Sequence, residues 1–89
     1  MVRLFARHSV QDFAAWKKVY DDFDAERREM GVRGHGVFQA VDDPNDVTVW
    51  HDFDSADAAG EFGESARLRE IMENAGVAGP PTLWITTPA

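Results

Sequence analysis

Residues 36–53 read GVFQAVDDPNDVTVWHDF, and this stretch decides the fold. Two runs rich in β-branched and aromatic residues, 36–41 and 47–53, flank a five-residue segment of turn formers, Asp42 to Asp46. A connection of that length between two such runs predicts an antiparallel β-hairpin. We therefore expect a hairpin in the middle of the chain, and its flanking segments decide the topology.

A strand and then a helix are predicted before the hairpin. Residues 2–8 alternate in side-chain character with the two-residue period of a strand. Asp12 can cap a helix, and apolar residues follow at helical spacing from Phe13 to Met30. Gly31 is a residue type that commonly ends a helix. We expect one helix between Asp12 and Gly31.

A second helical region and a last strand are predicted after the hairpin. Asp54 or Ser55 can cap the next helix, and Gly76 ends it. Gly60 and Gly63 weaken the middle of that helix, which predicts two helical pieces joined at a bend. Residues 82–86 are rich in strand-forming side chains and predict the last strand.

The order β-α-β-β-α-β is that of the ferredoxin-like α+β fold. We expect residues 1–89 to form a single domain, a four-stranded antiparallel sheet with two helices on one face. In its usual strand order, we expect the strands at 2–8 and 47–53 to lie side by side and parallel, with 36–41 antiparallel to 47–53. The second face of the sheet also carries aromatic residues, and the sheet of a second copy is the simplest cover. We therefore expect a homodimer.

The composition excludes several classes of function. The chain has 89 residues, a net charge of −7 and no cysteine. A chain this short buries only about 60–65% of its unfolded surface, which also favours a dimer. Its one basic cluster, Arg27-Arg28, lies between Glu26 and Glu29 and is expected to be a solvated helix end, so nucleic-acid binding is not expected. No apolar run could span a bilayer and no signal peptide is recognisable, so we expect a cytoplasmic protein.

Three histidines mark a candidate pocket. His8 and His51 lie at the ends of predicted strands, and His35 lies at the start of another. In the arrangement above, all three share one edge of the sheet. If Val41 pairs with Val47, His35 and His51 become diagonal neighbours on one face. We therefore expect the imidazoles to gather at a small-molecule pocket.

Imidazoles in a pocket can move protons near neutral pH. Cyclisation by aldol chemistry needs a base at an acidic carbon and a donor for the enolate oxygen. We expect His8, His35 or His51 to be the base and Tyr20 to be the donor; the alternative is that these residues have structural roles. Three histidines can also hold zinc or iron, but their spacing matches no ligand motif, and we expect no metal. No phosphate loop or nucleotide fingerprint is present, and we expect no cofactor.

Aromatic residues suit a flat, apolar substrate. The expected substrate contacts are Trp16, Phe23, Trp50 and Phe62. The alternative for Trp50, and for Trp84, is a place at the dimer interface. Arg3 and Arg7 alternate with Phe5 on one strand. They can hold a substrate carboxylate or pair with an acidic residue across the subunit boundary.

Four segments occur together that also mark a known family. They are Arg7–Phe13 running into Trp16-Lys17, Gly31–His35, Asp42–Asn45, and Ser65–Arg69 with Ala75–Val77. Together they resemble the dimeric α/β-barrel superfamily, in particular short bacterial proteins described as cyclases or as antibiotic biosynthesis monooxygenase-like. The resemblance implies two ferredoxin-like subunits packed sheet to sheet, each with a pocket between its helices and its sheet.

The resemblance spans several activities. They include cofactor-free oxygenases, polyketide cyclases, haem-degrading enzymes and stress proteins. The haem-degrading branch takes an iron ligand from its second helix, but Asp54 to Gly76 contains no histidine. The resemblance therefore implies a cofactor-independent cyclase or monooxygenase-like enzyme of secondary metabolism, acting on a polyketide-like aromatic molecule. The alternative is a non-catalytic small-molecule-binding or stress-response module.

Overall fold

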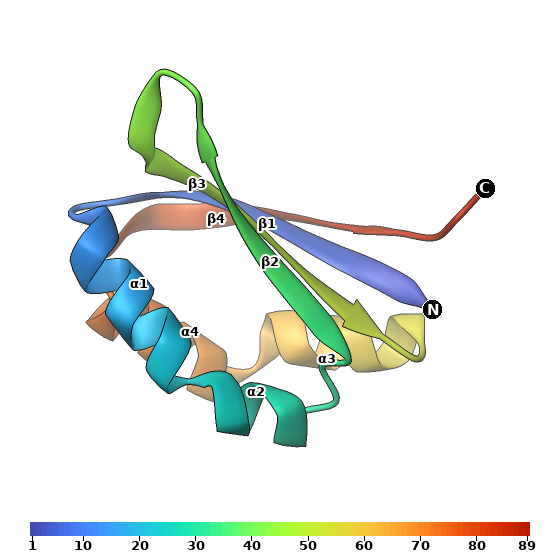
Figure 1. The fold of residues 1–89 in the computed structure, drawn as a ribbon. Coiled ribbons are helices and arrows are strands. Elements are labelled where there is room, and N and C mark those ends of the chain that lie inside the picture. The colour runs from blue at the N-terminus through green and yellow to red at the C-terminus, as the bar shows by residue number, and fades with distance from the viewer.

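The computed structural model describes residues 1–89 and consists of a single sheet with helices on one side (Figure 1). The elements are β1 (Val2–Val10), α1 (Phe13–Asp22), α2 (Asp24–Glu29), β2 (Gly34–Ala40), β3 (Asp43–Phe53), α3 (Ala56–Glu64), α4 (Ala66–Asn74) and β4 (Val77–Thr86). The strand order is β2-β3-β1-β4, and each neighbouring pair is antiparallel. This confirms the ferredoxin-like α+β fold. No helix is long and apolar enough to cross a membrane.

The direction of β3 differs from our expectation. β1 and β3 are neighbours but run antiparallel, so the predicted parallel pair is wrong. Helices α1 and α2 carry the chain back along the sheet, so β2 runs in the direction of β1 and the hairpin reverses β3. As a result His8 is opposite Val47, whereas His51 is opposite Leu4. Four residues of strand separate the two positions by about 13 Å, and the histidines do not share one edge.

The hairpin is tighter than the sequence suggests. Only Val41 and Asp42 lie between β2 and β3, in place of the five-residue loop. The register places His35 directly opposite His51, not diagonal to it. A register difference of two residues leaves each side chain on the same face, so His35 and His51 still share a face, as expected.

Both predicted helical regions are divided, at positions that the glycines do not mark. The first breaks at Phe23, between α1 and α2. The second breaks at Ser65, whose backbone is extended and whose side chain caps α4 by accepting from the Leu68 amide. Asp12 and Ser55 cap α1 and α3, as expected. The second break therefore lies at the capping residue Ser65 and not at Gly60 or Gly63, the residues of low helix propensity.

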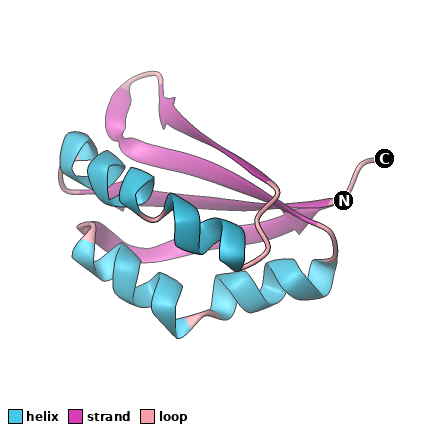
Figure 2. Cartoon of the chain, turned by 60° about the horizontal axis from the view of Figure 1, so that its bottom comes forward, coloured by secondary structure: helices cyan, strands magenta, loops and turns pink.

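The two faces of the sheet have different surroundings, because all the helices lie on one side (Figure 2). Alternate residues of β1 and β3, such as Leu4 and Phe53, are buried under the helices. The other face is open. There Phe5 stacks on Trp84 with ring centroids 5.3 Å apart, and the guanidinium of Arg3 lies 3.8 Å from the centroid of Trp50.

Both arginines of β1 are paired within the chain on this open face. Arg3 binds Asp52 at 2.7 Å, and Arg7 binds Asp46 at 2.6 Å. Arg3 and Arg7 therefore lie outside the helix-covered interior, where a substrate carboxylate was expected, and each already has an acidic partner in its own chain.

Candidate functional site

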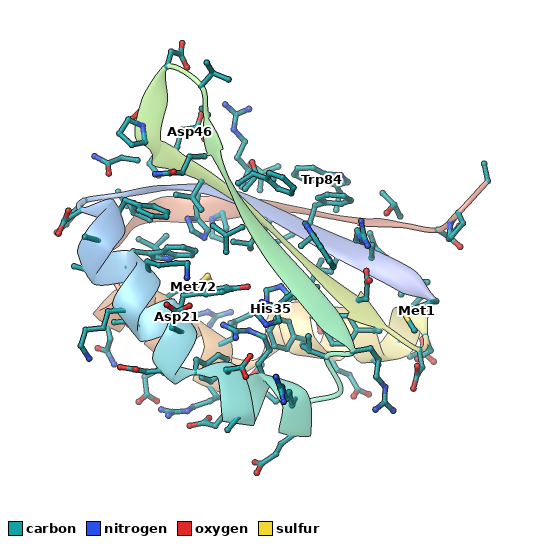
Figure 3. The ribbon with its side chains drawn as sticks, viewed as in Figure 1. Met1, Asp21, His35, Asp46, Met72 and Trp84 are labelled. Atoms are coloured by element: carbon teal, nitrogen blue, oxygen red, sulfur yellow. The ribbon has the colours of Figure 1, made fainter.

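A cavity of about 50 Å³ lies between the sheet and the helices. Its wall is mostly apolar and combines residues of β1, β3, β4 and all four helices. The expected site residues that line it are His8, Trp16, Tyr20, Phe23, His51 and Phe62. His35 and Trp50 are not in the wall. Figure 3 shows His35 and Met72 on the helix side of the sheet and Trp84 on the opposite side.

Trp50 lies on the open face because β3 alternates its side chains, and His51 takes the face toward the helices. The indole lies against Gly36 of the neighbouring strand. A Cβ atom at Gly36 would lie only 2.5 Å from the indole nitrogen. The structure therefore removes Trp50 from the set of cavity residues.

Tyr20 connects the cavity to the surface through a hydrogen-bonded chain. Its hydroxyl lies 2.5 Å from Nδ1 of His35, and Nε2 of His35 lies 3.0 Å from Oδ1 of Asp24. Because the Asp24 carboxylate accepts hydrogen bonds, Nε2 of His35 donates and Nδ1 accepts from Tyr20. Burial raises the pKa of Tyr20 to about 12, so its hydroxyl keeps the proton that it donates. His35 thus orients Tyr20 from outside the cavity.

The two histidines in the wall are neutral. Burial, together with the positive charge of Arg27, lowers the pKa of His51 to about 3. Burial also lowers the pKa of His8. Nε2 of His51 and Nδ1 of His8 are buried and have no hydrogen-bond partner. A neutral imidazole has one nitrogen free to accept a proton, so each side chain can act as a base.

The surroundings of these two histidines differ. The ring of His51 is 6.2 Å from that of Tyr20 and 6.0 Å from that of His35. His8 packs beside Trp16, with ring centroids 5.5 Å apart. Nowhere do three or more His, Cys, Asp or Glu side chains group together in a way that could hold a metal ion.

Arg27 is a cavity residue that the sequence did not lead us to expect. It is only 1% exposed and lines the cavity, so the expected solvated helix end is wrong for this residue. Nη2 donates to the Tyr20 carbonyl at 2.8 Å and Nη1 donates to Asp24 at 3.3 Å, while Nε has no partner. The guanidinium lies 3.9 Å from the centroid of the Tyr20 ring. Burial lowers the pKa of Arg27, but a guanidinium stays charged in proteins.

A signal for Arg27 is present in the sequence. The apolar face of the first helical region includes Tyr20, Phe23 and Met30, and Arg27 stands at the vacant position four residues after Phe23. The helical spacing therefore places Arg27 on the apolar side of the helix, away from Glu26 and Glu29.

Comparison with known proteins shows structural relatives only. No family model matches the sequence, and no curated protein is significantly similar to it. A proposed antibiotic biosynthesis monooxygenase from Bordetella bronchiseptica superposes with a TM-score of 0.84 at 18% identity, over 99% of this chain and 96% of that one. SnoaB, a cofactor-independent oxygenase from Streptomyces nogalater, gives 0.79 at 15% identity, over 99% and 92%.

A third structure is similar over nearly the whole chain. It is a proposed antibiotic biosynthesis monooxygenase from Caulobacter crescentus, with a TM-score of 0.77, 19% identity and coverage of 99% of this chain and 89% of that one. Identities this low establish the fold and not the chemistry. The chain therefore has the ferredoxin-like α+β fold of the antibiotic biosynthesis monooxygenase-like proteins.

Proposed function

We propose that this chain is a small-molecule enzyme of secondary metabolism, of the monooxygenase-like or cyclase type, in which His51 is the general base and no cofactor is needed. The observation that carries the proposal is the buried, unpartnered Nε2 of His51 in an apolar cavity that also holds the cation Arg27. The description of SnoaB as a cofactor-independent oxygenase supports this class of reaction.

His51 is a better candidate than His8 because a cation lies within its electrostatic range. Arg27 disfavours the protonated form of His51 while the cavity holds no negative charge. When a substrate loses a proton to His51, the new anion offsets the charge of Arg27 and stabilises the imidazolium. The base His51 and the cation Arg27 therefore both favour the state in which the substrate is an anion and His51 is protonated. His8 has the aromatic ring of Trp16 beside it instead.

The reaction begins with one proton transfer. An acidic C–H bond of the substrate breaks, its proton moves to Nε2 of His51, and its electron pair is delocalised onto a carbonyl oxygen. The Tyr20 hydroxyl has one proton, which it donates to Nδ1 of His35 in this structure; we propose that the hydroxyl turns and donates that proton to the enolate oxygen as the negative charge develops. The carbanion then adds to a second carbonyl of the same molecule in a cyclase, or reacts with O₂ in an oxygenase. Trp16, Phe23 and Phe62 supply the apolar wall.

The size of the cavity favours a second candidate function as well. Ligand pockets usually measure roughly 300–1,000 Å³, so the cavity of about 50 Å³ admits only a small molecule unless an element moves. Helix α4 has no fully buried residue and contributes Leu68, Ile71 and Met72 to the wall, which makes it the element to move for a larger substrate. A non-catalytic binding module would need no such movement.

We also propose that two copies pack through the open faces of their sheets. Phe38 is 62% exposed and Trp84 is 41% exposed there. Exposed aromatic residues on a flat sheet favour association. The internal pairs of Arg3 and Arg7 leave no unpaired cation on this face to oppose the approach of a second copy.

The test of the base is a pair of matched variants. Against a panel of aromatic substrates with an acidic carbon, we expect His51→Gln to lower kcat/KM by about 100-fold or more, the usual contribution of a general base. His8→Gln removes an equally buried imidazole from the same cavity and is expected to keep most of the activity. Equal turnover by wild type and His51→Gln would refute the assignment, and an absence of turnover on every substrate would favour the binding module.

A further inference from the structure

We infer that the cavity binds a single-ring organic acid as its anion, with the ionised oxygen of the ligand held by Arg27. This inference rests on the proposed function for the use of the cavity, and it adds the charge and size of the molecule that enters. It requires neither a particular reaction nor His51 as the base.

The first support is the incomplete hydrogen bonding of Arg27. Nη1 and Nη2 have partners in the chain, whereas the Nε–H has none. An unpaired donor on a buried cation is costly to stability, and such groups in native proteins have an explanation. Arg27 forms part of the cavity wall, so a small shift of its side chain would bring this donor to an oxygen of a bound molecule.

The second support is the charge balance around the cavity. Arg27 is the only permanently charged side chain in its wall, although the whole chain has a net charge of −7. The countercharge Asp24 is not in the wall, is about one-third exposed, and is shared with Arg28 and His35. A monoanion in the cavity therefore gains a nearby cation in an apolar setting, where the attraction is strongest.

The third support is the position of a second unpartnered group. The guanidinium of Arg27 and the ring of His51 both lie beside the ring of Tyr20, the first 3.9 Å and the second 6.2 Å from its centroid. The wall around them is aromatic, with Phe23 and Phe62. A ring that carries an oxygen anion matches both the polar groups and the aromatic wall.

The volume sets the size. A buried water needs about 10–15 Å³ of cavity volume, so a cavity of about 50 Å³ has room for only a few non-hydrogen atoms. Since a cavity of roughly 150 Å³ accommodates benzene, a single-ring acid enters this cavity with a displacement of α4, and an acid with several rings would need a larger one.

Two matched probes test the inference in the intact protein. 4-Nitrophenol is ionised at mildly alkaline pH, and 4-nitroanisole is the same molecule with its oxygen methylated. We expect calorimetry to show that wild type binds the nitrophenolate at least about tenfold more tightly than the ether. We expect Arg27→Met to abolish that preference and Arg28→Met, the exposed neighbouring arginine, to keep it.

A wild-type measurement covers the case in which Arg27→Met does not fold. The Nε–H resonance of Arg27 should shift in a ¹H–¹⁵N spectrum when nitrophenolate is added and stay in place with nitroanisole. Equal affinity for the two probes, binding of neither, an unmoved resonance, or a preference retained by folded Arg27→Met would each overturn the inference.

The outcome is separable from that of the proposed function. Anion binding is measured on wild type and Arg27→Met, whereas turnover is measured on His51→Gln, so each conclusion has its own variant. Anion binding through Arg27 together with unchanged turnover by His51→Gln would refute the catalytic base and leave this inference standing. Loss of turnover in His51→Gln with no preference for the anion would do the reverse.

Discussion

Both faces of the sheet carry aromatic side chains, but they differ in whether their polar groups have hydrogen-bond partners. On the open face, Arg3 and Arg7 each find a carboxylate within the chain. On the helix-covered face, His8, Arg27 and His51 each keep a buried nitrogen without a partner. A face whose polar groups are satisfied is ready to meet another surface, whereas unsatisfied groups in an enclosed space are ready to meet a ligand. Aromatic content alone would not have separated the two.

The largest expected effect comes from removing a side chain of the covered face. Phe53 is fully buried and packs against Phe62 with ring centroids 5.2 Å apart. We expect Phe53→Ala to lower the free energy of unfolding by about 3–5 kcal/mol, measured by urea denaturation. Phe38→Ala removes the same atoms from the open face and should cost less than about 1 kcal/mol in a monomer. Similar losses for both would mean that the two faces are equally covered.

The next effect is on association through the open face. Trp84 stacks on Phe5 and remains 41% exposed. We expect Trp84→Glu to weaken the dimer by about 2–4 kcal/mol, the range of an interface hot spot, and to halve the mass measured by light scattering at micromolar concentration. Trp84→Phe, which keeps a ring at this place, should stay dimeric. A monomeric wild type would remove the open face from consideration as an interface.

Gly36 offers a smaller and more local test. A Cβ there would meet the indole of Trp50 at 2.5 Å, so we expect Gly36→Ala to displace that ring and to destabilise the fold by about 1–3 kcal/mol. Gly60 in α3 has open space around its Cα, and Gly60→Ala should stabilise the protein by about 0.5–1 kcal/mol. Denaturation curves of the two variants should therefore move in opposite directions. A tolerated Gly36→Ala would mean that Trp50 is not fixed on the open face.

The covered face should also make stability depend on acid. The pKa of His51 falls from its ordinary value of 6.5 to about 3 on folding, because burial disfavours the charged imidazole. Below pH 6.5 the unfolded chain binds a proton that the folded chain does not, so stability is lost as the pH falls from 6.5 toward 3. The loss attributable to His51 is about 1.4 kcal/mol per pH unit at most.

Urea denaturation at several pH values measures this slope. His51→Gln lacks the titrating group, so its stability relative to wild type should improve as the pH falls through that window. A constant difference between the two proteins would show that His51 is not kept neutral by folding.

The sequence predicted the fold class because strand alternation and helical spacing are local properties. The alternation that buries Leu4 also orients Phe53, and the shared face of His35 and His51 survived an error of two residues in register. The direction of β3 relative to β1 was wrong because it depends on tracing the whole path of the chain. The break at Phe23 was missed because no capping side chain marks it in the sequence.

The candidate site was less accessible to sequence reasoning. His8, His51 and Tyr20 were identified by residue type, and the structure places them in one cavity wall. His35 acts on Tyr20 from outside, a distinction that only the pairing of Asp24 with its Nε2 reveals. Arg27 was assigned to solvent from its charged neighbours, although its spacing from Phe23 matched the apolar stripe. Spacing was the better guide, because neighbours in sequence lie on different sides of a helix.

The edges of the sheet limit how copies of this chain can aggregate. β4 is an edge strand, and it contains Pro80 and Pro81 at the place where its register with β1 shifts between Arg7 and Ser9. Prolines cannot donate to a further strand, so this edge resists the strand-by-strand addition that builds fibrils. The opposite edge, β2, has no proline. Strand addition at the β4 edge therefore meets an interruption at Pro80 and Pro81 that the β2 edge does not have.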